Sequence, residues 1–67
     1  MVGTIKSFHR KHGYGFLLDE KGTEYFFHIL QWKDRNLPKE GEKATFKPIK
    51  TDKGMKAEDI CRIRSNG

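Results

Sequence analysis

Residues 14–29 have the sequence YGFLLDEKGTEYFFHI, in which two short apolar runs flank the turn residues Glu20, Lys21 and Gly22. Most apolar positions in these runs, and in the rest of the chain, recur with a period of two, which is typical of β-strands. A short polar turn between two such runs favours an antiparallel hairpin. The sequence therefore predicts strands at residues 14–19 and 23–29 and a β-sheet fold around them.

Three further strands are predicted outside this hairpin, at residues 2–9, 43–49 and 55–64. Turn residues at 10–13 and 51–54 separate them from their neighbours. Residues 30–41 show no strand periodicity, which predicts a long irregular loop with room for one helical turn. Five short strands without an internal repeat fit a small closed or nearly closed all-β barrel. The length of 67 residues fits one domain covering residues 1–67.

Two of these strands contain an expected irregularity. In residues 2–9, Ile5 is expected to face inward and Lys6 and Ser7 to be exposed, while a bulge leaves the direction of Phe8 open. In residues 43–49, Pro48 has no N–H group to donate, so we expect it at a sheet edge or at a bulge.

The chain is small, and it is also basic. It contains 14 Lys and Arg residues and 9 Asp and Glu residues, which gives a formal net charge of +5. At this size the free energy of apolar burial roughly cancels the entropy lost on folding, so we do not expect a wide enzymatic cleft. The positive charge favours a polyanionic partner, although it also fits simple solubility.

The only cysteine, Cys61, excludes an internal disulfide. It lies near Ile60 and Ile63 in the last predicted strand, so we expect a small buried or half-buried thiol rather than a nucleophile. The start of the chain lacks the apolar core of a signal peptide, and the apolar cluster at residues 25–30 is too short to span a bilayer. We therefore expect a cytoplasmic protein with no membrane partner.

Strand alternation divides the aromatic residues between two faces of the sheet. The expected core consists of Ile5, Leu17, Tyr25, Phe27, Ile29, Phe46 and Ile60, with Ile63 as a second anchor of the last strand. The opposite face then carries a contiguous patch of Tyr14, Phe16, Phe26 and His28. An exposed aromatic patch is costly unless something flat covers it, and nucleic acid bases are flat. Lys6, Arg10, Lys11 and His12 flank the patch, a combination that single-stranded nucleic acids require. The alternative is that all these rings lie in the core.

At these residues the sequence resembles the bacterial cold-shock domain. The segments Gly3-Thr4-Ile5-Lys6-Ser7-Phe8 and Gly13-Tyr14-Gly15-Phe16-Leu17 are similar to the first ribonucleoprotein motif of that family, and Tyr25-Phe26-Phe27-His28 is similar to the second. The likeness continues through residues 41–46 and 53–60. It implies a five-stranded antiparallel barrel of the oligonucleotide/oligosaccharide-binding (OB) class. It also implies that nucleic acid is contacted by Lys6, Phe8, Tyr14, Phe16, Phe26, His28 and Lys53.

The sequence departs from the usual family pattern at four positions. The family usually has tryptophan at Ser7, asparagine at His9, lysine at His12 and an aromatic residue at Ile29. The absent ring at Ser7 predicts a loss of about 1–3 kcal/mol of stacking, unless Trp32 moves in from the long loop to replace it. Among the lysines of the second half, we expect contacts from Lys53 and Lys56.

Other chemistry has weaker support in the sequence. His9 and His12 lack a third and fourth metal ligand of suitable type, so we expect no metal and no cofactor. Gly13 and Gly15 enter a strand rather than a helix and do not form a dinucleotide-binding motif. Ser7 and His9 share a strand but have no orienting acid, so we do not expect an enzyme or a small-molecule substrate.

The sequence thus predicts a single-stranded RNA- or DNA-binding protein that acts as an RNA chaperone by base stacking, with low sequence specificity. One alternative is a basic ribosome-associated or duplex-binding protein in which charge dominates. Another is a protein-interaction or self-association module that uses the aromatic face, including a dimer that exchanges strands through the long loop instead of a monomer.

Overall fold

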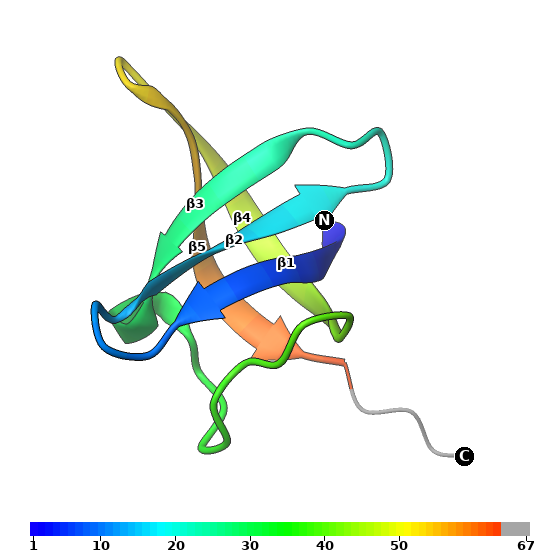
Figure 1. Ribbon diagram of the computed structural model, residues 1–67. Helices are drawn as coiled ribbons and strands as arrows, with labels where there is room; N and C mark the ends of the chain where they lie inside the picture. The colour runs from blue at the N-terminus through cyan, green and yellow to red at the C-terminus, as the bar shows by residue number, and fades with distance from the viewer. Residues whose placement is uncertain (64–67) are drawn as a thin grey trace.

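The computed structural model describes residues 1–63 of the chain, which form a closed five-stranded barrel (Figure 1). The elements are β1 (Val2–His9), β2 (Tyr14–Asp19), β3 (Glu24–His28), the 3-10 helix η1 (Ile29–Gln31), β4 (Lys43–Thr51) and β5 (Gly54–Arg62). The strand order around the barrel is β1-β2-β3-β5-β4. All neighbouring strands are antiparallel except β3 and β5, which meet in parallel. The all-β barrel is therefore confirmed. Within residues 1–63, no helix is long and apolar enough to cross a membrane.

The strand bounds follow the predicted ones most closely in the first half of the chain. Strands β1 and β2 begin and end where the alternation predicted. Strand β3 ends one residue early, because Ile29 begins η1 and the His28 side chain accepts a hydrogen bond from the Leu30 N–H group. This short helix corresponds to the single helical turn allowed for in the predicted loop at residues 30–41. Arg64, the predicted end of the last strand, lies outside the described residues.

The core lies inside the barrel and consists of Ile5, Leu17, Tyr25, Phe27, Trp32, Ala44, Phe46, Ala57 and Ile60. Every predicted core residue is among them except Ile29, which is half-buried and packs against this cluster from η1. The alternative that places all the rings in the core is wrong, because Phe26 is 41% exposed.

A bulge in β1 decides the direction of Phe8. The register passes from Ile5 opposite Leu17 to Ser7 opposite Phe16, so Lys6 is the extra residue. Phe8 then lies opposite Gly15 and stacks on Phe27, with ring centroids 6.0 Å apart and planes 8° apart. A Cβ atom on Gly15 would lie 2.9 Å from the Phe27 ring. Glycine therefore gives these two rings their space, and Phe8 packs partly against the core. Ser7 is half-buried rather than exposed.

A second irregularity, between β4 and β5, overturns two predictions for the last strand. The register shifts between Thr45 and Lys47, and Asp59 on β5 has a positive φ of 49°. Ala57 and Ile60 therefore both point inward although they are three residues apart. Cys61 is exposed rather than buried, and Ile63 is 39% exposed rather than an anchor. A strict period of two could not place either residue correctly.

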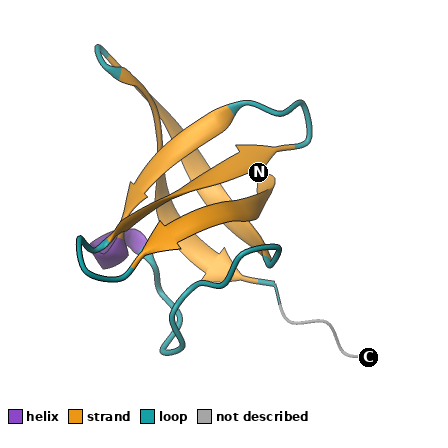
Figure 2. Ribbon diagram, in the orientation of Figure 1, coloured by secondary structure: helices purple, strands orange, loops and turns teal. Residues whose placement is uncertain are grey.

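The far half of the β4–β5 hairpin projects from the barrel (Figure 2). Strand β1 pairs with β4 only at residues 43–45, so the rest of β4 has β5 as its paired neighbour. Pro48 lies in this part, opposite Ala57. The missing N–H group of Pro48 is therefore placed where one side of the strand has no partner, as predicted.

Candidate nucleic-acid interface

The strand register arranges the outer face of β1, β2 and β3 into two rows of side chains. One row consists of Ser7, Phe16, Phe26 and Lys56, which are opposite one another across β1, β2, β3 and β5. The second row consists of His9, Tyr14 and His28. We call Tyr14, Phe16, Phe26 and His28 the aromatic platform. Because the residues of a row come from different strands, pairing of the backbone fixes their spacing.

Three rings of the platform support one another. The Tyr14 and Phe26 centroids lie 5.6 Å apart, and Phe16 meets Tyr14 and Phe26 edge-on at 5.9 and 5.8 Å. These are favourable aromatic geometries, so the rings hold each other in place. Phe26 is exposed, and Tyr14 and Phe16 are half-buried. The three rings therefore form an apolar surface that faces solvent and is held in place by its own ring contacts.

Two histidines extend this surface toward the β1–β2 turn. The His9 and His12 rings lie 5.0 and 5.9 Å from Tyr14, and both residues are exposed. Sequence reasoning weighed both histidines as metal ligands and as departures from the family pattern, and it placed His12 among the residues that flank the patch. The contact of His9 depends on its register position opposite Tyr14, which alternation within one strand does not reveal. Within residues 1–63, no group of three His, Cys, Asp or Glu side chains could hold a metal ion.

One ring nitrogen of His28 is occupied by a hydrogen bond within the protein. Its Nδ1 accepts a hydrogen bond of 3.1 Å from the Leu30 N–H group. An imidazole nitrogen that accepts carries no proton, so neutral His28 has its proton on Nε2. The exposed Nε2–H group is therefore available as a donor beside Tyr14 and Phe26.

The platform has a basic border. Arg10 and Lys11 are exposed in the β1–β2 turn, and residues 1–18 contain no Asp or Glu. Lys6 forms an exposed ion pair with Glu24. Such surface pairs contribute little, so Lys6 can exchange Glu24 for another anion at small cost.

Comparison with known proteins identifies the family of this chain. The family model described as the 'Cold-shock' DNA-binding domain matches residues 1–63. The chain belongs to this cold-shock domain family. Cold shock protein 1 of Lactiplantibacillus plantarum is 35% identical over 60 residues, which cover 87% of this chain and 91% of that protein. Cold shock protein CapB of Pseudomonas syringae pv. tomato is 33% identical over 61 residues, covering 88% of each chain.

A solved structure supports the fold. The chain matches Drosophila Unr CSD456 with a TM-score of 0.75 and 24% identity, over 97% of this chain and 27% of that longer chain. The family resemblance and the barrel expected from the sequence are both confirmed.

Two lysines in the second half of the chain, Lys53 and Lys56, were expected to contact nucleic acid. Lys53 is exposed in the β4–β5 turn, where its N–H group donates to the Thr51 hydroxyl. Lys56 is opposite Phe26 and pairs with Glu58 at 3.1 Å. Lys56 therefore borders the platform, whereas Lys53 lies on the projecting hairpin.

Trp32 is buried in this cold-shock domain, so in this structure it does not fill the place of the ring that is missing at Ser7. It is 6% exposed, and its ring lies 6.5 Å from that of Phe27. Its indole N–H donates to the Asn36 carbonyl, and the Arg62 guanidinium lies 5.7 Å from its ring. Arg62 also pairs with Glu42 at 2.9 Å. Trp32 therefore anchors the long loop to the barrel.

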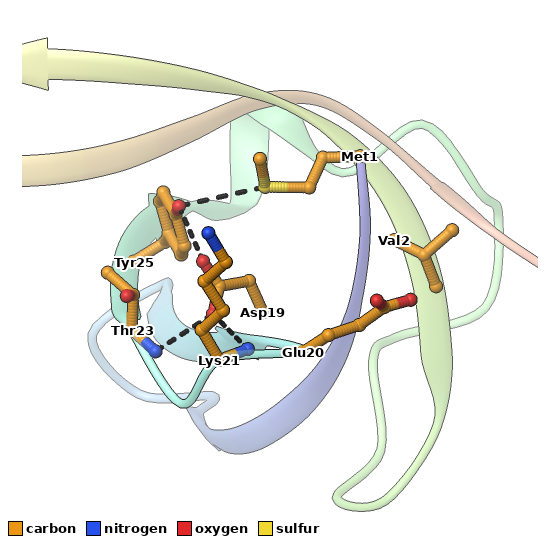
Figure 3. Close-up of a pocket in the computed structure, with 7 residues that line it drawn as sticks. All are labelled: Met1, Val2, Asp19, Glu20, Lys21, Thr23 and Tyr25. Carbon is orange, nitrogen blue, oxygen red and sulfur yellow. Dashed lines mark hydrogen bonds between the residues drawn. The ribbon is translucent and has the colours of Figure 1, made fainter.

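A hollow lies away from the platform, at the β2–β3 turn (Figure 3). It has a volume of about 560 Å³ and is lined by Met1, Val2, Asp19, Glu20, Lys21, Thr23 and Tyr25. The Asp19 carboxylate accepts hydrogen bonds from the N–H groups of Lys21 and Thr23 and from the Tyr25 hydroxyl. The bond from the Thr23 N–H group is the main cause that lowers the pKa of Asp19. Burial, and then the nearby Asp19 carboxylate, raise the pKa of Tyr25. These bonds close the turn, so we assign the hollow a structural role.

Proposed function

We propose that this cold-shock domain binds single-stranded RNA or DNA and acts as an RNA chaperone, without catalysing a reaction. Bases stack on Tyr14, Phe16, Phe26 and His28, and the phosphates follow Lys6, Arg10 and Lys11. The observation that carries the proposal is the cluster of three mutually supporting rings on the outer face of β2 and β3. The family match supports nucleic acid as the partner.

Stacking explains the preference for unpaired strands. Each base that stacks on an aromatic side chain gains about 1–3 kcal/mol, whereas the faces of bases inside a duplex are already covered. A protein present at 100 times its Kd shifts a folding equilibrium by about 2.7 kcal/mol. Weak RNA hairpins are therefore opened, while stable ones persist. No nucleotide hydrolysis is needed, because the binding free energy shifts the populations.

The other residues that we propose to contact nucleic acid differ in what they contribute to binding. Phe8 is half-buried and stacked on Phe27, so it offers less of its ring to a base than Phe26 does. The Nε2–H group of His28 donates to a phosphate or base oxygen next to the stacked bases. Lys53 and Lys56 add positive charge on the side of β5.

The proposal is tested by comparing a short labelled oligothymidylate, a matched oligouridylate and a duplex of the same length in fluorescence anisotropy. Both single strands should bind much more tightly than the duplex. Single-strand affinity should partly survive high salt, since stacking is insensitive to ionic strength. Equal binding of the duplex, with affinity lost at high salt, would instead support the charge-dominated alternative. Light scattering of the free protein tests self-association, which should block oligonucleotide binding if it uses the same rings.

A further inference from the structure

The barrel has a crevice where β3 and β5 meet. These strands pair at a single register position, Phe26 opposite Lys56, and the next bridge along the chain joins Trp32 to Ile60. Between these two points lies a hollow of about 150 Å³. Its lining residues are Phe26, Phe27, His28, Gln31, Lys56, Ala57 and Glu58. The crevice therefore opens directly beside the exposed ring of Phe26.

The polar groups of the crevice form a distinct pattern. Glu58 brings a carboxylate, which has two acceptor oxygens and no donor. Lys56 lies 3.1 Å from it and has two further N–H donors. The Gln31 Oε1 atom accepts from the Asp59 N–H group at 3.4 Å, which leaves the Gln31 amide N–H groups as donors. His28 adds its Nε2–H group, because its Nδ1 is occupied. The lining of the crevice thus combines one carboxylate, which only accepts hydrogen bonds, with donors from Lys56, Gln31 and His28.

We propose that this crevice recognises the edge of a guanine base stacked on Phe26, with Glu58 as the specificity-determining residue. Guanine presents two adjacent N–H donors, at N1 and N2, which match the two oxygens of the Glu58 carboxylate. Its O6 and N7 atoms are acceptors, and they match the donors of Lys56, Gln31 and His28. The inference deepens the proposed function and rests on it, since it concerns which base the platform prefers.

The other bases fit this pattern less well. Uracil and thymine present one N–H group between two carbonyl oxygens, so the second carboxylate oxygen faces a carbonyl. Adenine and cytosine present an amino group beside a ring nitrogen acceptor, which also repels that oxygen. Single-stranded bases expose these edges freely, so the crevice can discriminate between them.

The experiment compares a short oligothymidylate with the same strand carrying one central guanine or one central hypoxanthine, which lacks the N2 amino group. Kd is measured by competition in fluorescence anisotropy for the wild type, for Glu58→Gln and for Glu20→Gln. The last variant removes an equal charge at the β2–β3 turn. Circular dichroism checks that each variant is folded, which we expect since Glu58 forms only a partly exposed ion pair.

We expect the guanine strand to bind the wild type about tenfold more tightly than oligothymidylate, the size of one good bidentate contact. Hypoxanthine should lie between the two. Glu58→Gln should remove the preference and slightly strengthen binding of oligothymidylate, because it removes a negative charge. Glu20→Gln should keep the preference.

Two results would overturn the inference while leaving the proposed function in place. One is equal binding of guanine and thymine strands by the wild type, and the other is a guanine preference that persists in Glu58→Gln. Failure of every single strand to bind the wild type would overturn both the proposed function and the inference.

Discussion

Replacing Phe26 by alanine removes the exposed ring at the centre of the first row of side chains. Phe26 lies between Phe16 and Lys56 and touches the rings of Phe16 and Tyr14. One base loses its stacking partner, which costs about 1–3 kcal/mol. This corresponds to a Kd increased by about 5- to 150-fold. Phe26→Ala should also lower the free energy of unfolding, by about 1–2 kcal/mol. This loss is modest because the Phe26 side chain is 41% exposed and its removal costs mainly two aromatic contacts.

The assay is fluorescence anisotropy of a labelled oligothymidylate at fixed salt, with urea unfolding as the check on stability. Phe26→Leu is the matched variant, since it keeps an apolar side chain of similar size but has no flat ring. It should lose nearly as much affinity as Phe26→Ala, whereas Phe26→Tyr should bind like the wild type. The reasoning is refuted if Phe26→Ala and Phe26→Leu are folded and bind with wild-type affinity.

Three other substitutions test the remaining parts of the account. Arg10→Gln should reduce the slope of log Kd against log salt by about 0.7 if Arg10 contacts one phosphate, and an unchanged slope measured by anisotropy would exclude that contact. Asp19→Asn should lower the midpoint of thermal unfolding at pH 7. The pKa of Asp19 is lowered from its usual 3.8, so its contribution is present above that pH and is lost as the pH falls through the lowered pKa. Asp19→Asn should therefore also weaken the dependence of the unfolding midpoint on pH in the acid range. An unchanged dependence on pH would contradict the structural role assigned to Asp19. Gly15→Ala should cost about 1–3 kcal/mol in urea unfolding, because its Cβ atom would lie 2.5 Å from the Ser7 carbonyl oxygen and 2.9 Å from the Phe27 ring. Gly22→Ala is the control with open space around it, so only its positive φ should matter, and equal losses from both would argue against the close packing at Gly15.

The parts of the fold that the sequence predicted well depend on local alternation. Strands β1 and β2 were placed correctly because glycine and charged turn residues interrupt a clear period of two. The outward direction of Phe26 follows from the same period, since Tyr25 and Phe27 fill the core on either side of it.

The errors arose where a tertiary contact or a bulge overrides the period. Trp32 lies in a loop without periodicity, and its burial depends on Phe27 and on Arg62, which is 30 positions away in the chain. Cys61 follows the irregularity at Asp59, so its direction could not be counted from the start of the strand. The His9 contact with Tyr14 required the register across the β1 bulge, which no single strand reveals.

A nuclear magnetic resonance titration of the uniformly ¹⁵N-labelled domain with a short oligothymidylate tests the location of the interface most directly. The account predicts the largest amide shifts at the end of β1 and along β2 and β3, at His9, Tyr14, Phe16, Phe26 and His28. The amides around Asp19 in the β2–β3 turn should remain unchanged. Shifts confined to the projecting β4–β5 hairpin, with β2 and β3 unaffected, would contradict the aromatic platform as the binding surface.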